Sequence, residues 1–275
     1  MALYDVVNGV YRKVIKKYDK VDGVYRNVTK AYDPVDGVYR QYFSGGTPVS
    51  TLAVGDSVWL NVNGSLTKFL VVHQGNPDSA MYDASCDGTW LLMQDLFVRR
   101  IWNDYSDYGG QGNNDYKNSI AHSYLNGYFL GFLDSGTQSA IKQIKLPYHN
   151  GTGSGGSVAS GADGLSTKIF LLSGYEVGWT KSTSSYFPMD GAKLSYFASG
   201  TGDSANAKRK AIFNGSYALW WLRSPHTQAS SNVWAVNTAG KNSYSSYADS
   251  YGIRPAFILD SNTTFDNSTG KNIIA

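Results

Sequence analysis

The chain has a single cysteine and no long hydrophobic run. The one cysteine, Cys86, excludes an intramolecular disulfide, so the fold depends on packing alone. No apolar stretch approaches the ~18 residues of a membrane-spanning helix. Residues 1–10 also lack a cationic region followed by an apolar run. We therefore expect no membrane insertion and no signal peptide.

Charge is also scarce. Charged residues make up 16% of the 275 residues, the formal net charge is +3, and much of the basic excess lies near the N-terminus. A domain without a strong positive field is poorly suited to binding nucleic acid. We expect no nucleic acid among the partners.

Motifs typical of catalysis are missing. The sequence contains no Gly-x-Ser-x-Gly elbow and no glycine-rich phosphate loop, which would support acyl transfer or nucleotide chemistry. The four histidines lack the paired spacing of a zinc site: His73, His122, His149 and His226. We predict that the protein is not an enzyme, with no catalytic residue and no cofactor.

Two tripeptides match motifs of calcium-dependent lectins. These are Asn76-Pro77-Asp78 and Trp102-Asn103-Asp104, but their spacing does not favour the six to eight converging oxygens that calcium needs. Asp104, Asp107 and Asp115 form an acidic cluster of residue types that also favour turns. We interpret all of these residues as turn and cap residues and predict no metal site, although a cation near residues 104–115 stays open.

The abundant residues indicate a β-rich fold. The chain has 30 Gly, 21 Tyr and 7 Trp, which favours short strands and turns over long helices. Tyr and Trp are amphipathic and suit surfaces as well as cores. We predict an α+β domain that is rich in strands, with short helices.

The N-terminus contains three copies of a 14-residue repeat. Tyr-Asp recurs at residues 4, 18 and 32, and Gly-Val-Tyr-Arg recurs at residues 9, 23 and 37. Asn8-Gly9, Asp22-Gly23 and Asp36-Gly37 are turn sequences of two-residue hairpins. We predict that residues 1–46 form three hairpins, which stack on each other, on the next domain or on a partner because one unit cannot bury its own face.

The main domain is predicted to span residues 47–275, after the turn-rich break at residues 44–48. Strands are predicted at residues 54–60, 68–72, 90–93, 168–173, 217–222 and 253–259. Helices are predicted at residues 119–126, 139–144 and 206–213. Asn63-Gly64 is a predicted turn, residues 150–164 a flexible glycine-rich loop, and residues from 260 onward a tail.

Two apolar segments enclose a polar one near the C-terminus. Residues 220–225 and 251–257 have the pattern of buried strands, and each contains an arginine, Arg223 or Arg254, that must be paired if buried. Residues 226–250 between them consist mostly of Ser, Asn, Ala, Thr and Tyr. This is the composition of a recognition surface, since Tyr gives stiff contact area and Ser and Asn give adaptable hydrogen bonds.

We therefore predict that residues 226–250 form a ligand-binding surface, whereas an ordinary Ser/Asn-rich loop of a fixed binding domain is the alternative. The predicted ligand-binding residues are His226, Thr227, Gln228, Ser230, Ser231, Asn232, Trp234, Asn237, Asn242, Tyr244, Tyr247 and Asp249.

These segments together resemble a known domain type. Residues 54–58, 118–120, 124–126 and 168–173, followed by the two apolar segments, occur in the order seen in C-type-lectin-like domains of bacteria and phages, the DUF6273-like group. The resemblance covers roughly residues 50 to 260. It implies the C-type-lectin-like fold, which is also the fold of formylglycine-generating enzymes. Their copper site uses two cysteines, so Cys86 alone cannot reproduce it.

The resemblance also implies a function. Some members of this group are variable proteins of diversity-generating retroelements, in which adenines of Asn codons are rewritten to give Ser, Tyr, Thr, Asp, His or Ala. We expect a phage tail or virion receptor-binding protein that is assembled in the bacterial cytoplasm and binds a host-surface protein or glycan. Residues 1–43 would attach it to other virion proteins, or to further copies as in a homotrimer. The alternative is a structural decoration or tail protein without receptor specificity.

Overall fold

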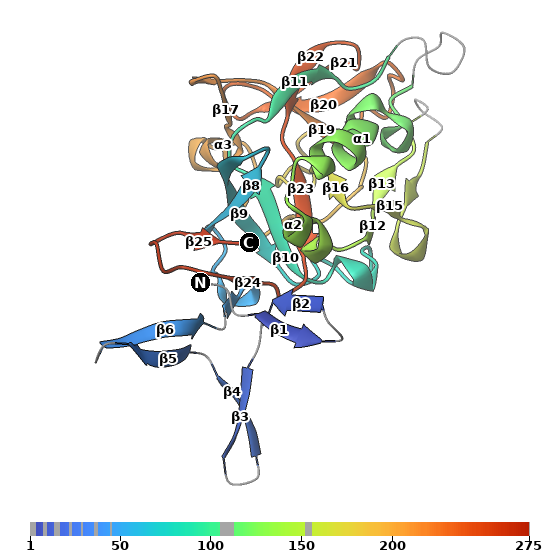
Figure 1. The fold of residues 1–275 in the computed structure, drawn as a ribbon. Coiled ribbons are helices and arrows are strands. Elements are labelled where there is room, and N and C mark those ends of the chain that lie inside the picture. Colours follow the sequence, from blue (N-terminus) through green and yellow to red (C-terminus); the bar gives the residue numbers. More distant parts are fainter. Residues whose placement is uncertain are drawn as a thin grey trace.

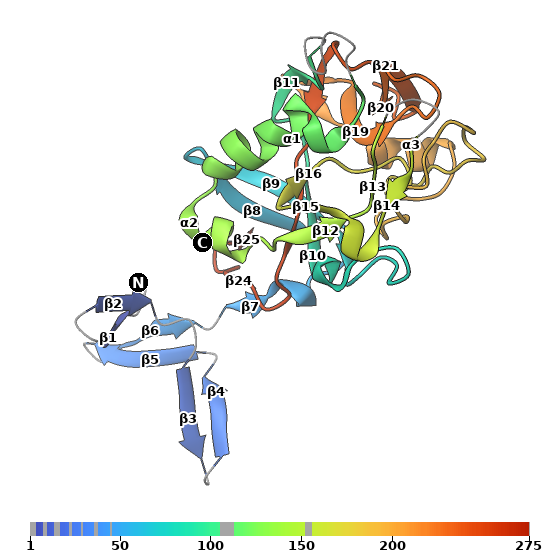
Figure 2. The same cartoon turned by 90° about the vertical axis from the view of Figure 1, so that its right-hand side faces the viewer.

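The computed structural model describes residues 46–104, 113–151 and 156–274, together with the backbone of the strands between residues 4 and 44. Within residues 46–274 the chain forms two main sheets with short helices beside them. In the views of Figures 1 and 2 the five-stranded sheet forms the top of the domain, and the six-stranded sheet lies below it. The described part is thus β-rich with few, short helices.

The six-stranded sheet holds the centre of the core. Its order is β16-β23-β10-β9-β8-β25, with β16 Ile169–Phe170, β23 Ala256–Leu259, β10 Thr89–Met93, β9 Ser65–Gln74, β8 Ser57–Val62 and β25 Asn272–Ile273. All residues of β10 are buried, and its Leu91 is opposite Phe257. The rings of Phe69 and Phe257 are 5.2 Å apart between centroids.

The predicted turn between the first two strands of this sheet is confirmed. Asn63 and Gly64 join β8 to β9 with φ values of 49° and 78°. Both residues therefore occupy the left-handed region that a two-residue type I′ hairpin requires, and Asn and Gly tolerate it best.

The five-stranded sheet carries the segment predicted to bind a ligand. Its order is β11-β22-β19-β20-β21, with β11 Val98–Ile101, β22 Ser250–Ile253, β19 Trp220–Pro225, β20 Asn232–Val236 and β21 Asn242–Ser246. Strand β19 runs parallel to β22 at Trp220 and Gly252, while β20 and β21 form an antiparallel hairpin. Residues 226–249 are therefore two strands with three connecting segments, Ser250 begins β22, and β21 is an edge strand.

The prediction of one strand over residues 253–259 is wrong. The chain leaves the five-stranded sheet after Ile253 and enters the six-stranded sheet at Ala256. Pro255 has no backbone N–H and cannot donate a hydrogen bond to a neighbouring strand. The Arg254 side chain donates instead to the carbonyl oxygens of Met93 and Gln94, each at 2.9 Å. The two residues thus form the corner at which the chain passes from one sheet to the other.

The three α-helices are short: α1 Ile120–Tyr124, α2 Ser135–Ala140 and α3 Asp203–Arg209. The predicted helix at residues 119–126 is confirmed, with Ser119 as its N-cap and a π-helix, η4 Leu125–Phe129, continuing it. The helix predicted at 139–144 lies earlier, because Asp134 caps it and the chain then joins the sheet at Ile141.

The helix predicted at residues 206–213 also begins and ends earlier than expected. It stops at Arg209, and Ile212–Phe213 (β17) pairs with Ser216–Tyr217 (β18). The turn between these strands contains Asn214 and Gly215, with φ values of 49° and 82°. This hairpin follows the same physical rule as the turn between β8 and β9.

Short elements complete the domain. The two-stranded pairs are β7 Thr47–Pro48 with β24 Thr264–Phe265, β12 Ile144–Leu146 with β15 Leu165–Thr167, and β13 Tyr148–His149 with β14 Val158–Ala159. The 3-10 helices are η1 Val49–Thr51, η2 Ala84–Cys86, η3 Tyr116–Asn118 and η6 Gly161–Asp163. The loop predicted at 150–164 therefore contains a strand and a helical turn, while its residues 152–155 lie outside the described part.

The prediction that residues from 260 onward form a tail is wrong. Strand β24 pairs with β7, and β25 runs parallel to β8 at the edge of the six-stranded sheet. Phe265 and Ile274 are buried. Gly46 lies so close to this segment that an added Cβ would be 2.6 Å from the Cβ of Thr264. The C-terminal segment therefore packs against the first residues of the domain.

Each N-terminal repeat forms one antiparallel hairpin in the described backbone. The pairs are β1 Tyr4–Val7 with β2 Val10–Lys13, β3 Lys17–Val21 with β4 Val24–Val28, and β5 Lys30–Val35 with β6 Val38–Ser44. In each hairpin, the pair of residues next to the turn is Val opposite Val. The predicted turn residues between them lie outside the described residues, and the assignment of residues 1–46 as a separate attachment segment stays a prediction.

Tryptophan dominates the interior. Six of the seven Trp side chains are buried: Trp90, Trp102, Trp179, Trp220, Trp221 and Trp234. Buried indole N–H groups need acceptors, and those of Trp90, Trp102 and Trp220 donate to carbonyl oxygens at 2.9–3.1 Å. Among the described residues, no helix has the length and apolar character that crossing a membrane requires.

The burial of Phe257 gives a first prediction. Replacing Phe257 by Ala should lower the free energy of unfolding by about 3–5 kcal/mol, because a large buried ring is removed from the centre of the six-stranded sheet. Thermal and urea unfolding measure the change. Leu66→Ala, at a side chain that is 43% exposed, is the control and should have little effect. Equal effects of the two changes would contradict the assigned core.

Candidate ligand-binding face

The two apolar segments around residues 226–250 are buried, as predicted. Their aromatic and aliphatic residues have at most 1% of their surface exposed: Trp220, Trp221, Leu222, Ile253, Ala256 and Phe257. Both arginines are paired, also as predicted. The guanidinium of Arg254 bonds to carbonyl oxygens and lies 4.9 Å from the centroid of the Trp220 ring, which stabilises the cation without a carboxylate.

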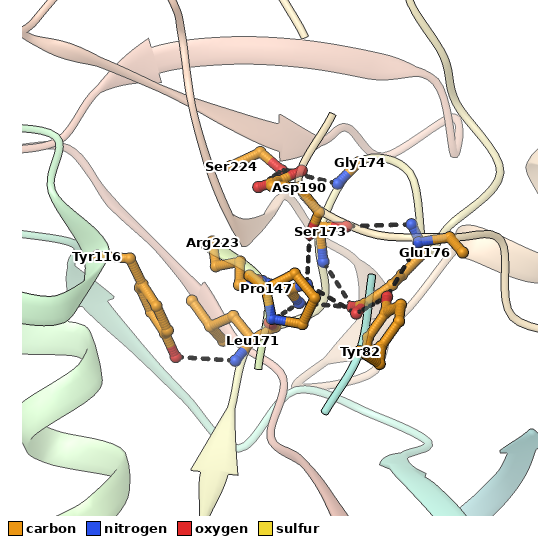
Figure 3. Close-up of polar contacts among 11 residues, drawn as sticks. Tyr82, Tyr116, Pro147, Leu171, Ser173, Gly174, Glu176, Asp190, Arg223 and Ser224 are labelled. Atoms are coloured by element: carbon orange, nitrogen blue, oxygen red, sulfur yellow. Dashed lines mark hydrogen bonds and ion pairs between the residues drawn. The ribbon is translucent and has the colours of Figure 1, made fainter. Parts of the chain in front are cut away.

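Arg223 lies at the centre of a buried polar cluster (Figure 3). Its Nη1 and Nη2 donate to the two carboxylate oxygens of Glu176 at 2.6 and 2.7 Å. The same guanidinium donates to the carbonyl oxygens of Pro147, Leu171 and Asp190. All five donors of an arginine can thus be used at once, and one side chain joins three segments that are far apart in the sequence.

This cluster also explains the shortened strand at residues 168–173. Only Ile169–Phe170 is in a strand, because the carbonyl oxygens of Leu171 and Leu172 accept from the side chain and backbone N–H of Arg223. The chain then turns at Ser173, whose N–H donates to Glu176 Oε2 at 2.9 Å. Tyr82 donates to the other carboxylate oxygen at 2.8 Å.

Asp190 is the second buried carboxyl group of the cluster. It accepts from the hydroxyl of Ser224 at 2.8 and 3.0 Å, and the same hydroxyl accepts from the Gly174 N–H. Burial raises the pKa of Asp190 to about 7, despite the opposing effects of Arg223 and Ser224. The negative charge of Glu176 adds a smaller effect in the same direction as burial. Because these side chains are fully buried, they are suited to hold the fold rather than to meet a substrate.

The predicted ligand-binding residues divide into three groups. Four are exposed: Gln228, Ser230, Ser231 and Tyr244. Five are half-buried: Thr227, Asn232, Asn237, Asn242 and Asp249. Three are buried and thus poorly placed to meet a ligand, although their assignment as ligand-binding residues stays a prediction: His226, Trp234 and Tyr247.

Each buried residue has a structural reason for its position. Trp234 is on β20, which is enclosed on both faces, and its ring stacks on Phe187 with centroids 3.8 Å apart. His226 stacks on Trp234 at 5.5 Å. The backbone of Tyr247 accepts from the N–H groups of Trp102 and Asn103, which places it against another segment. These contacts are non-local, and the local composition does not reveal them.

Two exposed tyrosines cover the buried aromatic stack. The Tyr186 ring is 4.8 Å and the Tyr244 ring 4.9 Å from the His226 ring, and Tyr244 meets Trp234 edge-on at 5.4 Å. Tyr244 is 52% exposed and Tyr186 is 39% exposed. We refer to Tyr186, Gln228, Ser230, Ser231 and Tyr244 as the tyrosine face. It combines exposed aromatic area with a rigid support.

Tyr186 was not among the residues predicted from the sequence. Its carbonyl oxygen accepts from the N–H and the hydroxyl of Thr227 and from the indole of Trp234. The loop at residues 181–189 is thereby fastened to the segment at 226–234. A sign was present in the sequence, since residues 182–186 have the same Ser, Thr and Tyr composition as residues 226–250.

Asn114 fixes the connection between β19 and β20. Its amide Nδ2 donates to the carbonyl oxygens of His226, Ala229 and Asn232 at 3.2, 3.0 and 2.8 Å. The N–H of His226 also donates to Asn232 across the loop. Because these acceptors belong to the backbone, the bonds from Asn114 do not depend on the side chains that the loop carries.

Two half-buried residues of the prediction have local roles. Asn237 Oδ1 accepts from the N–H groups of Ala239 and Lys241 and so shapes the turn between β20 and β21. Asp249 accepts from the Ser245 hydroxyl, which also bonds to Tyr251. These side chains already have partners within the domain, so they are weaker candidates for contact with a ligand than the tyrosine face.

The residues of the calcium-lectin tripeptides have turn and cap roles. Asn76 Oδ1 accepts from the Asp78 N–H, and Asp78 Oδ1 accepts from the Ala80 N–H. Asn103 is buried and bonds to Asn113 O and Ile120 N. Asp115 accepts from the Lys117 N–H. No metal-binding group of three or more His, Cys, Asp or Glu occurs within the described ranges, and Asp107 lies outside them.

The fold and this site define a β-rich domain that presents an aromatic and hydroxyl-rich face on a buried frame. The family model described as Domain of unknown function (DUF6273) matches residues 87–261, which is more than half of the chain. The chain therefore belongs to this family. The comparison with curated proteins and the comparison with solved structures each gave no match.

The buried Asp190 gives a second prediction. Its pKa is about 7 in the folded protein against 3.8 for the free group, so the folded state binds more protons between these values. Its contribution to stability is thus fully present below pH 3.8 and is lost as the pH rises through about 7. Relative to Asp190→Asn, the wild type should lose about 2 kcal/mol between pH 5 and pH 8.

Thermal unfolding of both proteins across this pH range measures the difference. Asp163→Asn, at an exposed carboxylate, is the matched control and should follow the wild type. A constant difference between wild type and Asp190→Asn from pH 5 to pH 8 would contradict the raised pKa.

Proposed function

We propose that this protein recognises a ligand through the tyrosine face. The observation that carries the proposal is the pair of exposed rings, Tyr186 and Tyr244, supported by the buried rings of His226 and Trp234. Binding energy in interfaces concentrates in such aromatic residues, and a supported ring loses little conformational entropy when it binds. Gln228, Ser230 and Ser231 add exposed hydrogen-bonding groups in the connection between β19 and β20.

The domain is proposed to be of the C-type-lectin-like type. The order of the sequence motifs and the polar segment enclosed by two buried strands support this assignment. By the same resemblance, the protein is proposed to be a phage tail or virion receptor-binding protein whose ligand is a protein or glycan on a bacterial host. The codons of the exposed residues within 226–250 are candidates for rewriting by a retroelement. A near-copy of the codons for residues 226–250 beside a reverse transcriptase gene would test that point.

The role is proposed to be binding rather than catalysis. The strongest polar cluster, around Arg223, Glu176 and Asp190, is fully buried and its groups are occupied by each other and by backbone carbonyls. The tyrosine face, in contrast, presents amide, hydroxyl and aromatic groups. These groups recognise a ligand without a chemical step.

A third prediction tests the tyrosine face. The double change Tyr186→Ala and Tyr244→Ala should weaken binding to host cells at least tenfold, because both exposed anchors are removed. The melting temperature should change little, since exposed side chains contribute little to stability. Fluorescently labelled protein and flow cytometry on host cells measure binding, and thermal unfolding measures stability.

Two controls separate binding from folding. Tyr217→Ala removes a 54% exposed tyrosine of β18, which is outside the tyrosine face, and should leave cell binding unchanged. Tyr247→Ala removes a buried ring and should lower the melting temperature. Unchanged cell binding by the Tyr186/Tyr244 variant would refute the proposed function and favour a structural tail or decoration protein.

The N-terminal hairpins are proposed to attach the domain to other virion proteins or to further copies of the chain. Each hairpin is a two-stranded sheet, and no other strand of the described chain pairs with its outer edges. Such edges are available for pairing with another chain. The segment would then be dispensable for folding of the domain.

A fourth prediction follows from this division. Deleting residues 1–45 should leave a soluble domain with nearly the melting temperature and the cell binding of the full chain. Its mass by light scattering should be that of a monomer, and it should no longer join particles or oligomers. Failure of the shortened protein to fold would show that the hairpins belong to the core and that the boundary near residue 46 is wrong.

A further inference from the structure

A cavity of about 330 Å³ opens beside the tyrosine face. It is lined by His149, Gly156, Ser157, Val158, Lys181, Ser185, Phe187, Pro188, Met189 and Thr227. Two of these residues connect it to the face. Phe187 stacks on Trp234 under Tyr244, and the Thr227 hydroxyl donates to the carbonyl oxygen of Tyr186. A ligand in the cavity could therefore extend over the exposed tyrosines.

The cavity has one apolar and one polar wall. Met189, which is 49% exposed, and the half-buried Val158 supply the accessible apolar surface, while Phe187 and Pro188 are buried. Ser157, Ser185 and Thr227 supply hydroxyl groups. The Thr227 hydroxyl already donates a hydrogen bond to the carbonyl oxygen of Tyr186. The Thr227 oxygen is thus an acceptor, while the two serines are able to donate or accept. A ligand that fits must combine an apolar face with several hydroxyls.

The charge in the cavity is positive. Lys181 is the one charged side chain among the described residues that line it, and no carboxylate lies among them. Burial lowers the pKa of His149, which disfavours its charged form, and its Nδ1 accepts from the Gly151 N–H. The nearest acid in the sequence, Asp190, is buried and bonded to Ser224. The site therefore favours an anionic ligand.

We propose that this cavity binds a carboxylate-bearing sugar residue of a host-surface glycan. The sugar carboxylate would meet Lys181, its hydroxyls would bond to Ser157, Ser185 and Thr227, and its apolar ring face would lie on Met189. The inference rests on the proposed recognition function and names the chemical class of its ligand. It also adds to the site a residue from outside residues 226–250, Lys181.

The size and chemistry favour a sugar over an acidic peptide. At about 330 Å³ the cavity is at the small end of ligand sites, which commonly measure ~300–1,000 Å³. It therefore suits one ring rather than a folded peptide segment. One cation with three hydroxyl side chains matches a ligand with one carboxylate and many hydroxyls, whereas an acidic peptide repeats its charge.

Saturation-transfer NMR on the full chain tests the inference. The probes are methyl glucuronoside and methyl glucoside, which differ only in a carboxylate in place of a hydroxymethyl group. We expect the glucuronoside to bind at least tenfold more tightly. Lys181→Met should remove this preference, while Lys193→Met, at another exposed lysine, should keep it. A melting curve of each variant confirms that it is folded.

Three results would overturn the inference: no binding of the glucuronoside, equal binding of the two sugars, or unchanged preference in Lys181→Met. Tighter binding of a tetraglutamate peptide than of the glucuronoside would also overturn it, in favour of an acidic peptide. Cell binding distinguishes this failure from failure of the proposed function. If Lys181→Met binds host cells normally but the Tyr186/Tyr244 variant does not, the tyrosine face stands and only the sugar site is wrong.

Discussion

The ion pair between Arg223 and Glu176 is the interaction on which the tyrosine face depends. Both side chains are fully buried, and theirs is the one ion pair found within the described part of the chain. Removing one partner of such a pair costs about 3–5 kcal/mol, because the other charge is left buried alone. That is a large share of the ~5–15 kcal/mol that stabilises a domain. Since Arg223 immediately precedes Ser224, Pro225 and His226, this pair fixes the point at which the polar segment leaves the core.

The same pair links the polar segment to the loop that carries Tyr186. Arg223 donates to the Asp190 carbonyl, and Ser224 donates to the Asp190 carboxyl group. Asp190 directly follows the loop at residues 181–189, so two neighbouring residues of β19 position both sides of the tyrosine face. Burial raises the pKa of Asp190 to about 7, although Arg223 and the Ser224 hydroxyl oppose the shift. The support for the face is therefore sensitive to pH near neutrality, while the face itself carries no titrating carboxyl group.

Local patterns in the sequence predicted the elements whose cause is local. The Asn63-Gly64 turn, the helix at residues 119–126 and the two buried segments depend on φ preferences, on contacts within one helical turn or on runs of apolar residues. Features that depend on distant partners were missed. Trp234 is buried because Phe187 stacks on it, and Tyr186 joins the face because Thr227 and Trp234 hold its carbonyl. Composition predicted a recognition surface at residues 226–250, but it could not show which of its aromatic residues face the solvent.

The way in which the polar segment is held makes its exposed positions tolerant of change. Asn114 binds three backbone carbonyls of the loop before β20, and β20 pairs with β21 through backbone hydrogen bonds. Neither interaction uses the side chains of Gln228, Ser230, Ser231 or Tyr244. Substitutions at such positions usually change stability by no more than about 0.5 kcal/mol. Backbone contacts thus hold the loop, and buried side chains hold its two ends. A surface of this kind is free to vary in chemistry without loss of the fold, as the proposed diversification of its codons would require.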